Sequence, residues 1–262
     1  MKTKVENEIE KFVKANLPKA GEILRKKFKK VGVKYTKSHA LDVVTEADLA
    51  ANRLLLSAIK KTFPDHGIIS EETAEYKNGS EYIWVIDPLD GTLNFSRGIP
   101  IFVTMLAVFR NKELIMSAIY DPLRKEMTFA RKGLGATVDG KKIMASKNNR
   151  LSESIGGVSS VFKKEQKKLF DMLVDSEKRV VAITIGSAGA NGMYVARGAI
   201  DWYVNYNPRI WDIAPNVLLF SEAGYKVTNI AGKPWKFGDQ GIIAAEKTLH
   251  KRLVELVKKS MK

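Results

Sequence analysis

The amino-acid sequence predicts an α+β protein with two sheets and with helices between and outside them. Three observations support this fold class. The chain opens with two long segments of helical periodicity, continues with apolar strands separated by turns, and ends with helices and strands in alternation. Its 262 residues, 45% of them hydrophobic, suffice for one large domain or for two lobes that share a core.

The first two expected helices are amphipathic. Residues 3–30 and residues 46–63 both carry apolar side chains near helical spacing. Thr45 is a suitable N-cap for the second helix, because the acid Asp48 follows three residues later. The sequence Pro-Asp-His-Gly at 64–67 ends that helix.

The remaining elements follow from strand-like and helix-like runs between turns. The expected strands are residues 83–86, 101–109, 114–120, 127–130, 179–184 and 200–204, with short ones near residues 225 and 241. The expected later helices are residues 163–176, 186–197, 212–222 and 247–259.

Composition excludes several kinds of chemistry. The chain has no cysteine, which excludes disulfides, cysteine-ligated zinc and thiol catalysis. Its three histidines, His39, His66 and His250, are too few for a histidine-rich metal site, and we expect His39 and His66 to be ordinary turn residues. Carboxylates that hold a hard cation are the chemistry that remains. Abundant lysine without cysteine also suits a thermophile.

Charge is unevenly distributed along this chain, whose net charge is +15. Residues 1–37 carry 12 Lys and Arg against 4 acids, whereas residues 38–100 carry 10 acids against 5 basic residues. An acidic region in a basic protein is expected where cations bind. The basic N-terminal region also allows nucleic-acid binding, although its lysines follow an ordinary amphipathic pattern and no arginine-rich stretch is present.

Residues 84–92 form the most informative segment. An apolar strand runs directly into Asp87 and Asp90, so that a strand end holds two carboxylates with a proline fixing the turn between them. The N–H groups of Gly91 and Thr92, which follow, are free to face an anion. The same residues also fit a plain turn with solvated acids.

Other polar segments fit either a site or a local structural role. Glu71 and Glu72 end a short apolar strand, where they repel each other unless a cation lies between them, or they form a surface turn. Asp48, near the start of a helix, is either a site acid or an acid that the helix dipole favours. Asp212, which opens a later helix, is either a site acid or the N-cap of that helix. The small residues at 186–191 let backbone approach a ligand or let two helices pack closely.

Read in order, these segments resemble the inositol monophosphatase family, within the superfamily of lithium-sensitive, magnesium-dependent phosphatases. Three blocks carry the resemblance: the Glu71-Glu72 pair, Asp87-Pro-Leu-Asp90-Gly-Thr92-Leu-Asn-Phe, and Trp211-Asp212-Ile-Ala. The resemblance extends from about residue 35 to residue 245. It implies layers in the order α-β-α-β-α and a homodimer. It also implies one domain over 1–262, with most metal ligands in lobe 1–150 and the substrate contacts and last metal ligand in lobe 151–262.

The resemblance implies two or three magnesium ions held by oxygen ligands. Family enzymes hold one ion with the counterparts of Glu71, Asp87 and the Leu89 carbonyl. They hold a second ion with the counterparts of Asp87, Asp90 and Asp212, and a third, weaker one near Glu71.

The resemblance also implies catalytic and substrate-binding roles. The counterparts of Asp48 and Thr92, with Glu71, position and deprotonate a water that attacks phosphorus in line, without a phosphoenzyme. Lys37 matches a mobile loop lysine near the metal. The residues expected to contact substrate are Asp90, Gly91, Thr92, Ser187, Ala188, Asn205 and Arg209.

Two of these positions depart from the family pattern. Asn205 stands where the inositol enzymes often carry an acid that grips substrate hydroxyls. Arg209 adds a cation near the expected pocket mouth, where it can meet a second phosphate or a surface acid. Both departures leave the metal chemistry intact and bear on the substrate.

The expected function is hydrolysis of inositol 1-phosphate, with fructose 1,6-bisphosphate as a second substrate. One alternative is a 3′-phosphoadenosine 5′-phosphate or NADP phosphatase, which the basic surface suits. The alternative outside enzymology is RNA or partner binding through the basic N-terminal helix. No apolar run approaches the ~18–20 residues that span a bilayer, and the N-terminus has no signal-peptide core, so we expect a cytoplasmic protein.

Overall fold

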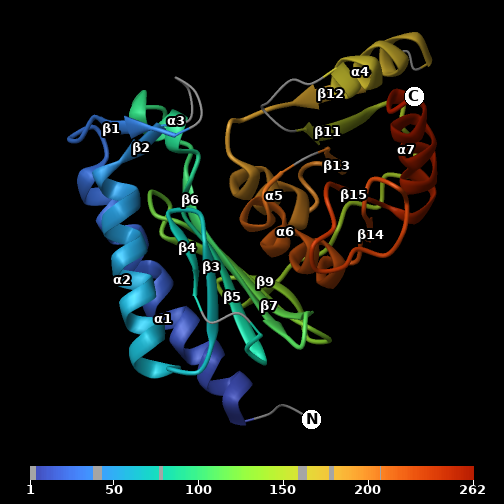
Figure 1. Ribbon diagram of the computed structural model, residues 1–262. Coiled ribbons are helices and arrows are strands. Elements are labelled where there is room, and N and C mark those ends of the chain that lie inside the picture. Colours follow the sequence, from blue (N-terminus) through green and yellow to red (C-terminus); the bar gives the residue numbers. More distant parts are fainter. Residues whose placement is uncertain (1–3, 38–42, 77–78, 159–163, 177–179, 207) are drawn as a thin grey trace.

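Five layers alternate in the computed structural model, which describes all residues except 1–3, 38–42, 77–78, 159–163, 177–179 and 207 (Figure 1). An eight-stranded and a five-stranded sheet are the two β layers. The outer helices on the first sheet are α1 (Lys4–Lys27) and α2 (Glu46–Thr62), those between the sheets are α5 (Ala188–Ala196) and α6 (Ile210–Ala223), and those on the far face are α4 (Lys164–Ser176) and α7 (Lys247–Ser260). The predicted order α-β-α-β-α is confirmed.

The eight-stranded sheet has the order β10-β9-β8-β7-β6-β5-β3-β4, and only β3 and β5 pair in parallel. Its strands are β3 (Gly67–Ser70), β4 (Thr73–Tyr76), β5 (Tyr82–Asp90), β6 (Val103–Arg110), β7 (Glu113–Asp121), β8 (Glu126–Arg131), β9 (Gly135–Val138) and β10 (Lys141–Lys142). The short helix α3 (Thr92–Ser96) follows β5, and β1 (Val33–Thr36) pairs with β2 (Val43–Thr45) separately. The four strands predicted between residues 83 and 130 are confirmed as β5 to β8.

The five-stranded sheet has the order β12-β11-β13-β15-β14. Its strands are β11 (Ser154–Val158), β12 (Val180–Ile183), β13 (Trp202–Asn205), β14 (Lys226–Thr228) and β15 (Ile242–Ala245). Strand β11 was not predicted, because its two glycines weaken the strand signal. Packing requires one of them, since a Cβ on Gly156 would lie 2.0 Å from the ring of Trp202.

The start of α2 agrees with the prediction. Thr45 is its N-cap, and Thr45 Oγ1 accepts a hydrogen bond from Ala47 N at 3.1 Å. Asp48 Oδ2 in turn accepts from Thr45 N at 2.8 Å and from Thr45 Oγ1 at 2.5 Å. The cap therefore fixes the Asp48 carboxylate as well as the helix end.

The start of α6 differs from the prediction. The helix begins at Ile210, with Arg209 as N-cap, so Asp212 occupies the third helical position. The local role considered for Asp212 as N-cap is wrong, because its Oδ2 accepts from the backbone N–H of Arg209 at 2.8 Å. None of the described helices is long and apolar enough to cross a membrane.

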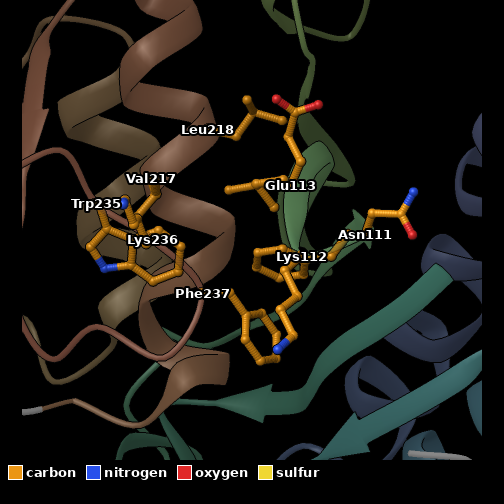
Figure 2. A pocket seen from close by; sticks show the side chains of 10 residues that line it. Asn111, Lys112, Glu113, Val217, Leu218, Trp235, Lys236 and Phe237 are labelled. Atoms are coloured by element: carbon orange, nitrogen blue, oxygen red, sulfur yellow. The ribbon is translucent and has the colours of Figure 1, made fainter. Parts of the chain in front are cut away.

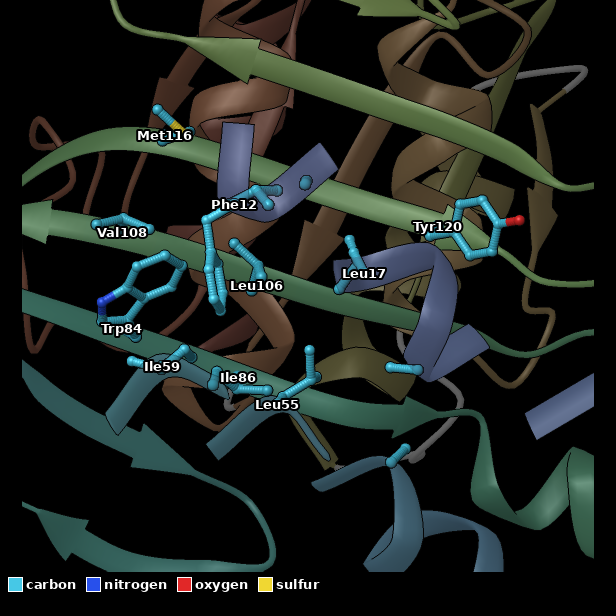
Figure 3. Close-up of a cluster of buried hydrophobic side chains, with 14 of the residues drawn as sticks. Phe12, Leu17, Leu55, Ile59, Trp84, Ile86, Leu106, Val108, Met116 and Tyr120 are labelled. Atoms are coloured by element: carbon cyan, nitrogen blue, oxygen red, sulfur yellow. The ribbon is translucent and has the colours of Figure 1, made fainter. Parts of the chain in front are cut away.

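The core between the outer helices and the eight-stranded sheet combines aliphatic and aromatic side chains (Figure 3). Phe12 of α1 meets the fully buried Trp84 of β5 edge-on, with ring centroids 5.4 Å apart. The prediction that His66 is an ordinary turn residue is wrong, because its side chain is buried. Its ring stacks between Phe63 and Tyr82, at 4.8 and 4.7 Å, and Nδ1 accepts from Trp84 Nε1 at 3.0 Å. His39 lies outside the described residues.

We predict that one buried histidine makes stability fall in mild acid. Burial, and then the charge of Lys226, lowers the pKa of His250 to about 4, below its usual ~6.5. The unfolded chain therefore takes up a proton first, and this contribution is lost as pH falls from about 6.5 to about 4. His250→Gln should show a flatter dependence of the urea midpoint over that range. Parallel pH profiles of variant and wild type would contradict the prediction.

Candidate active site

Parallel pairing of β3 and β5 brings the first two acids together. Ser70 pairs with Ile86, so the residues that follow them, Glu71 and Asp87, lie side by side at the carboxyl ends of both strands. Glu71 N donates to Ile86 O at 3.2 Å, and the two carboxyl groups are within hydrogen-bonding contact. The strand pairing therefore places this acid pair.

An irregularity in β5 brings Asp90 to the same place. Opposite β6, Asp87 pairs with Met105 and Asp90 pairs with Val103, so one strand has an extra residue. In a regular strand two residues three apart point to opposite faces, and the bulge removes that alternation. Asp87 and Asp90 thereby contribute to one cluster.

Helices α5 and α6 complete the cluster from the layer between the sheets. Asp90 accepts hydrogen bonds from Ala188 N at 3.0 Å, from Gly189 N at 2.6 Å and from the Ser187 hydroxyl. Asp212 comes from the first turn of α6. One carboxylate oxygen from each of Asp87, Asp90 and Asp212 lies within 4.8 Å of the others.

This grouping is electrostatically unfavourable without a cation. Burial, and then the charges of Glu71, Asp90 and Asp212, raises the pKa of Asp87 well above its usual range. Burial and then Asp90 raises the pKa of Asp212 to about 8. Buried acids that repel one another, all offering oxygen ligands, fit a divalent cation such as Mg²⁺.

Lys37 brings a positive charge to Glu71, the acid beside Asp87, and to Glu72. Its Nζ lies 3.0 Å from Glu71 Oε1 and 2.8 Å from Glu72 Oε1. Burial lowers the pKa of Lys37, but the two glutamates outweigh it and the net pKa is raised. The Lys37 ammonium therefore offsets part of the negative charge of this glutamate pair.

Thr92 and Asp48 form a second contact beside the cluster. Thr92 Oγ1 lies 3.0 Å from Asp48 Oδ1 and 2.8 Å from Leu89 O, and its single hydrogen is donated to one of them at a time. Burial raises the pKa of Asp48 to about 6 despite the hydrogen bonds from Thr45. Asp48 is therefore a stronger base than a solvated aspartate.

The turn before α3 depends on a glycine and an asparagine. Gly91 has φ of +90°, and a Cβ there would lie 2.9 Å from Ile101 O. Asn94 Nδ2 donates to Ile101 O at 3.0 Å and to Ile185 O at 2.8 Å, so it ties α3 to the segment that leads into α5. Asn94 belongs to the segment 87–95 that carries the family resemblance, but the sequence analysis did not predict that it ties these two segments together.

The predicted substrate contacts are brought near the cluster to different degrees. The Ser187 hydroxyl is bonded to Asp90, and Ala188 N donates to the same carboxylate. Asn205 is buried, and its Nδ2 donates to Tyr203 OH at 3.3 Å. Arg209 is exposed, and among the described residues none forms an ion pair with it.

A cavity of about 490 Å³ lies elsewhere, between the β6–β7 hairpin and α6 (Figure 2). Phe109, Leu218, Trp235 and Phe237 are among the residues that line it. None of the predicted site residues lines this cavity, so it is separate from the carboxylate cluster.

The chain is similar to known proteins over most of its length. The sequence model of the inositol monophosphatase family matches residues 5–262. A Thermotoga maritima protein named fructose-1,6-bisphosphatase/inositol-1-monophosphatase is 34% identical over 242 residues, which cover 92% of each chain. A Pseudomonas aeruginosa protein named Nus factor SuhB is 33% identical over 238 residues, covering 87% of this chain and 88% of the relative. The solved structure of a Thermotoga maritima IMPase has a TM-score of 0.88 at 31% identity, covering 97% of this chain and 98% of the other.

The layered α-β-α-β-α fold and these similarities define a phosphatase of a magnesium-dependent class. The chain belongs to the inositol monophosphatase family, and it is a phosphoric monoester hydrolase.

We predict that one acid of the cluster destabilises the magnesium-free protein. In the wild-type protein Leu89 N donates to Asp87 Oδ1 at 3.0 Å. Asp87→Asn keeps an oxygen that can accept this hydrogen bond and removes one of the mutually repelling charges. Its melting temperature without Mg²⁺ should rise by roughly 2–4 °C per kcal/mol of repulsion relieved, and Mg²⁺ should no longer raise it.

The chain supplies a matched control for this measurement. Asp121 also begins an Asp-Pro-Leu turn, and its Oδ1 accepts from Leu123 N at 2.9 Å, but its ion-pair partner is Arg124 rather than another acid. Asp121→Asn should not raise the melting temperature. Equal effects of the two substitutions would contradict repulsion at Asp87.

Proposed function

We propose that this chain is a magnesium-dependent phosphatase of small phosphorylated polyols, which hydrolyses inositol 1-phosphate and also the 1-phosphate of fructose 1,6-bisphosphate. The observation that carries the proposal is the group formed by the buried Asp87 and Asp90 with the half-buried Asp212, beside the Thr92–Asp48 pair. Such a site combines cation binding with a base for water, as phosphate ester hydrolysis requires.

Glu71, Asp87, the Leu89 carbonyl, Asp90 and Asp212 would hold the magnesium ions. Bound magnesium supplies the positive charge that neutralises the phosphate, acidifies a water and stabilises the leaving alkoxide. The protein's part is to hold these oxygens together, with the α5 N–H groups and Arg209 N orienting Asp90 and Asp212.

Thr92 and Asp48 would receive the proton of the attacking water. Asp48 Oδ2 is occupied by two donors from Thr45, which leaves Oδ1 for the Thr92 hydroxyl. When Thr92 donates to Oδ1, its own lone pairs are free to accept a water proton. The water oxygen forms the new bond to phosphorus and the bond to the ester oxygen breaks. The departing alkoxide would take a proton from a water molecule, and Asp48 would return the proton that it received to solvent.

The backbone N–H groups of Gly91 and Thr92 would hold phosphate oxygens. They open α3, and the left-handed conformation of Gly91 turns the chain there. Ser187, Ala188 and Asn205 would meet the hydroxyl groups of the substrate. We further propose that lobe 1–150 supplies most metal ligands, that lobe 151–262 supplies Asp212 and the substrate contacts, and that the protein is a homodimer.

The substrate proposal rests on relatives and on charge. Proteins from Thermotoga maritima and Aquifex aeolicus named for both activities are 34% and 32% identical to this chain. Asn205 lacks the charge that would repel a second phosphate, and the exposed Arg209 can attract one.

A phosphate-release panel tests the proposal. It compares inositol 1-phosphate, fructose 1,6-bisphosphate, 3′-phosphoadenosine 5′-phosphate and NADP, each with and without Mg²⁺. We expect magnesium-dependent release from the first two. A preference for either nucleotide would replace the proposed substrate, and no release from any of them would sink the enzymatic proposal.

A second function is favoured by relatives named Nus factor SuhB. A role in a macromolecular complex would use surfaces away from the carboxylates, and the net charge of +15 suits a polyanionic partner. Fluorescence titration with single-stranded RNA at two salt concentrations tests it. Binding with a submicromolar Kd at physiological salt would support this second function. If no such binding is found, only the phosphatase proposal remains.

We predict that Thr92 acts on the water rather than on substrate affinity. Thr92→Ala should lower kcat by roughly 10²–10⁴, the usual range for loss of an acid–base element, with KM changed much less. Thr92→Ser keeps the hydroxyl next to Asp48 and is the control, which should retain most activity. A greatly raised KM with kcat preserved would make Thr92 a binding residue instead.

We predict that Arg209 favours bisphosphates. Arg209→Ala should lower kcat/KM for fructose 1,6-bisphosphate on the order of tenfold more than for inositol 1-phosphate, because a charge-assisted contact contributes ~1.5–3 kcal/mol. Arg150→Ala, which removes an arginine whose side chain is 71% exposed, is the charge-matched control. Equal losses on both substrates would remove Arg209 from substrate selection.

A further inference from the structure

Helices α5 and α6 are joined by one fully buried side chain, Asn216. Its Nδ2 donates to Ala188 O at 3.1 Å and to Asp212 O at 3.0 Å. Ala188 is the first residue of α5, and Asp212 is the third residue of α6. A single amide group therefore holds the first turns of both helices.

Gly192 of α5 makes room for this amide. A Cβ at position 192 would lie 1.7 Å from Asn216 Oδ1 and 2.6 Å from its Cγ, so any other residue there would displace Asn216 or the helix. The Asn216 side chain therefore fills the space that the missing side chain of Gly192 leaves open.

The amide is not explained by packing alone. Asn216 Oδ1 is buried and has no hydrogen-bond partner among the described residues. An unsatisfied buried polar atom costs ~1–3 kcal/mol, so an apolar side chain of similar size would suit the space better. What Asn216 adds is its pair of N–H donors.

Each of the two helix turns that Asn216 joins positions one acid of the cluster. The first turn of α5 supplies Ala188 N and Gly189 N, which orient the Asp90 carboxylate. The first turn of α6 carries Asp212 itself. A shift between these turns would change the separation of the two carboxylates directly.

We propose that Asn216 is a positioning residue, which sets the distance between the Asp90 and Asp212 carboxylates by joining the first turns of α5 and α6. The inference rests on the metal site proposed above. Groups that orient metal ligands typically contribute ~10–100-fold to metal affinity. Loss of the Asn216 donors should weaken Mg²⁺ binding by a factor in that range.

A double substitution separates positioning from space filling. Asn216→Ala leaves a void, Gly192→Ala brings a methyl group into that same space, and the two together restore packing without the donors. The double variant should regain the thermal stability that Asn216→Ala loses in the absence of Mg²⁺. Its Mg²⁺ dissociation constant, measured by calorimetric titration, should remain ~10–100-fold above wild type.

Asn216→Leu is a second variant, which keeps the volume without donors and should show the same loss of Mg²⁺ affinity. Ser221→Ala is the matched control on α6, because Ser221 Oγ also donates to a carbonyl four residues back, that of Val217, at 2.8 Å. Its Mg²⁺ affinity should equal that of wild type.

The outcomes distinguish this inference from the proposed function. Wild-type Mg²⁺ affinity in the double variant and in Asn216→Leu would overturn the positioning role alone. A wild-type protein that binds no Mg²⁺, or binds it equally well after Asp212→Asn, would overturn the metal site and this inference with it.

Discussion

Carboxylates that repel one another are held together where both halves of the chain meet. Asp87, Asp90 and Asp212 lie close enough to share a cation, and burial raises the pKa of each. Each acid accepts at least one backbone N–H, from Leu89, from the start of α5 and from Arg209. Backbone donors cannot rotate away as side chains can, so the fold holds acids that would otherwise separate.

Local sequence predicted the parts of this site that depend on neighbours in the chain. A strand that ends in Asp87-Pro-Leu-Asp90 and a helix capped by Thr45 with Asp48 are both visible within a few residues, and the structure has both. The start of α6 was misplaced because its N-cap, Arg209, offers no side-chain acceptor. The Asp212 carboxylate, at the third position of the helix, accepts a hydrogen bond from the backbone N–H of Arg209. The polar side chain at this helix start therefore lies three residues later than a usual N-cap residue would.

What sequence could not predict depends on residues far apart in the chain. The glycine of β11 at Gly156 reads as a poor strand former until the Trp202 ring is seen lying over it. Gly192 and Asn216 look unrelated for the same reason, since the glycine leaves a hollow that only the packed helices reveal. A glycine within a helix or strand therefore indicates that another side chain or backbone segment packs closely against it, but only the fold shows which one.

Two turns with the same sequence show where the chemistry resides. Asp-Pro-Leu occurs at 87–89 and at 121–123, and in both the aspartate Oδ1 accepts from the leucine N–H. Asp121 lies beside Arg124, so its charge is compensated locally. Asp87 faces Glu71, Asp90 and Asp212 instead, because β3, the bulge in β5 and the first turn of α6 converge there. The turn itself supplies only an oriented carboxylate. The charges around it differ: Asp121 has a cationic neighbour, whereas Asp87 lies among acids that raise its pKa.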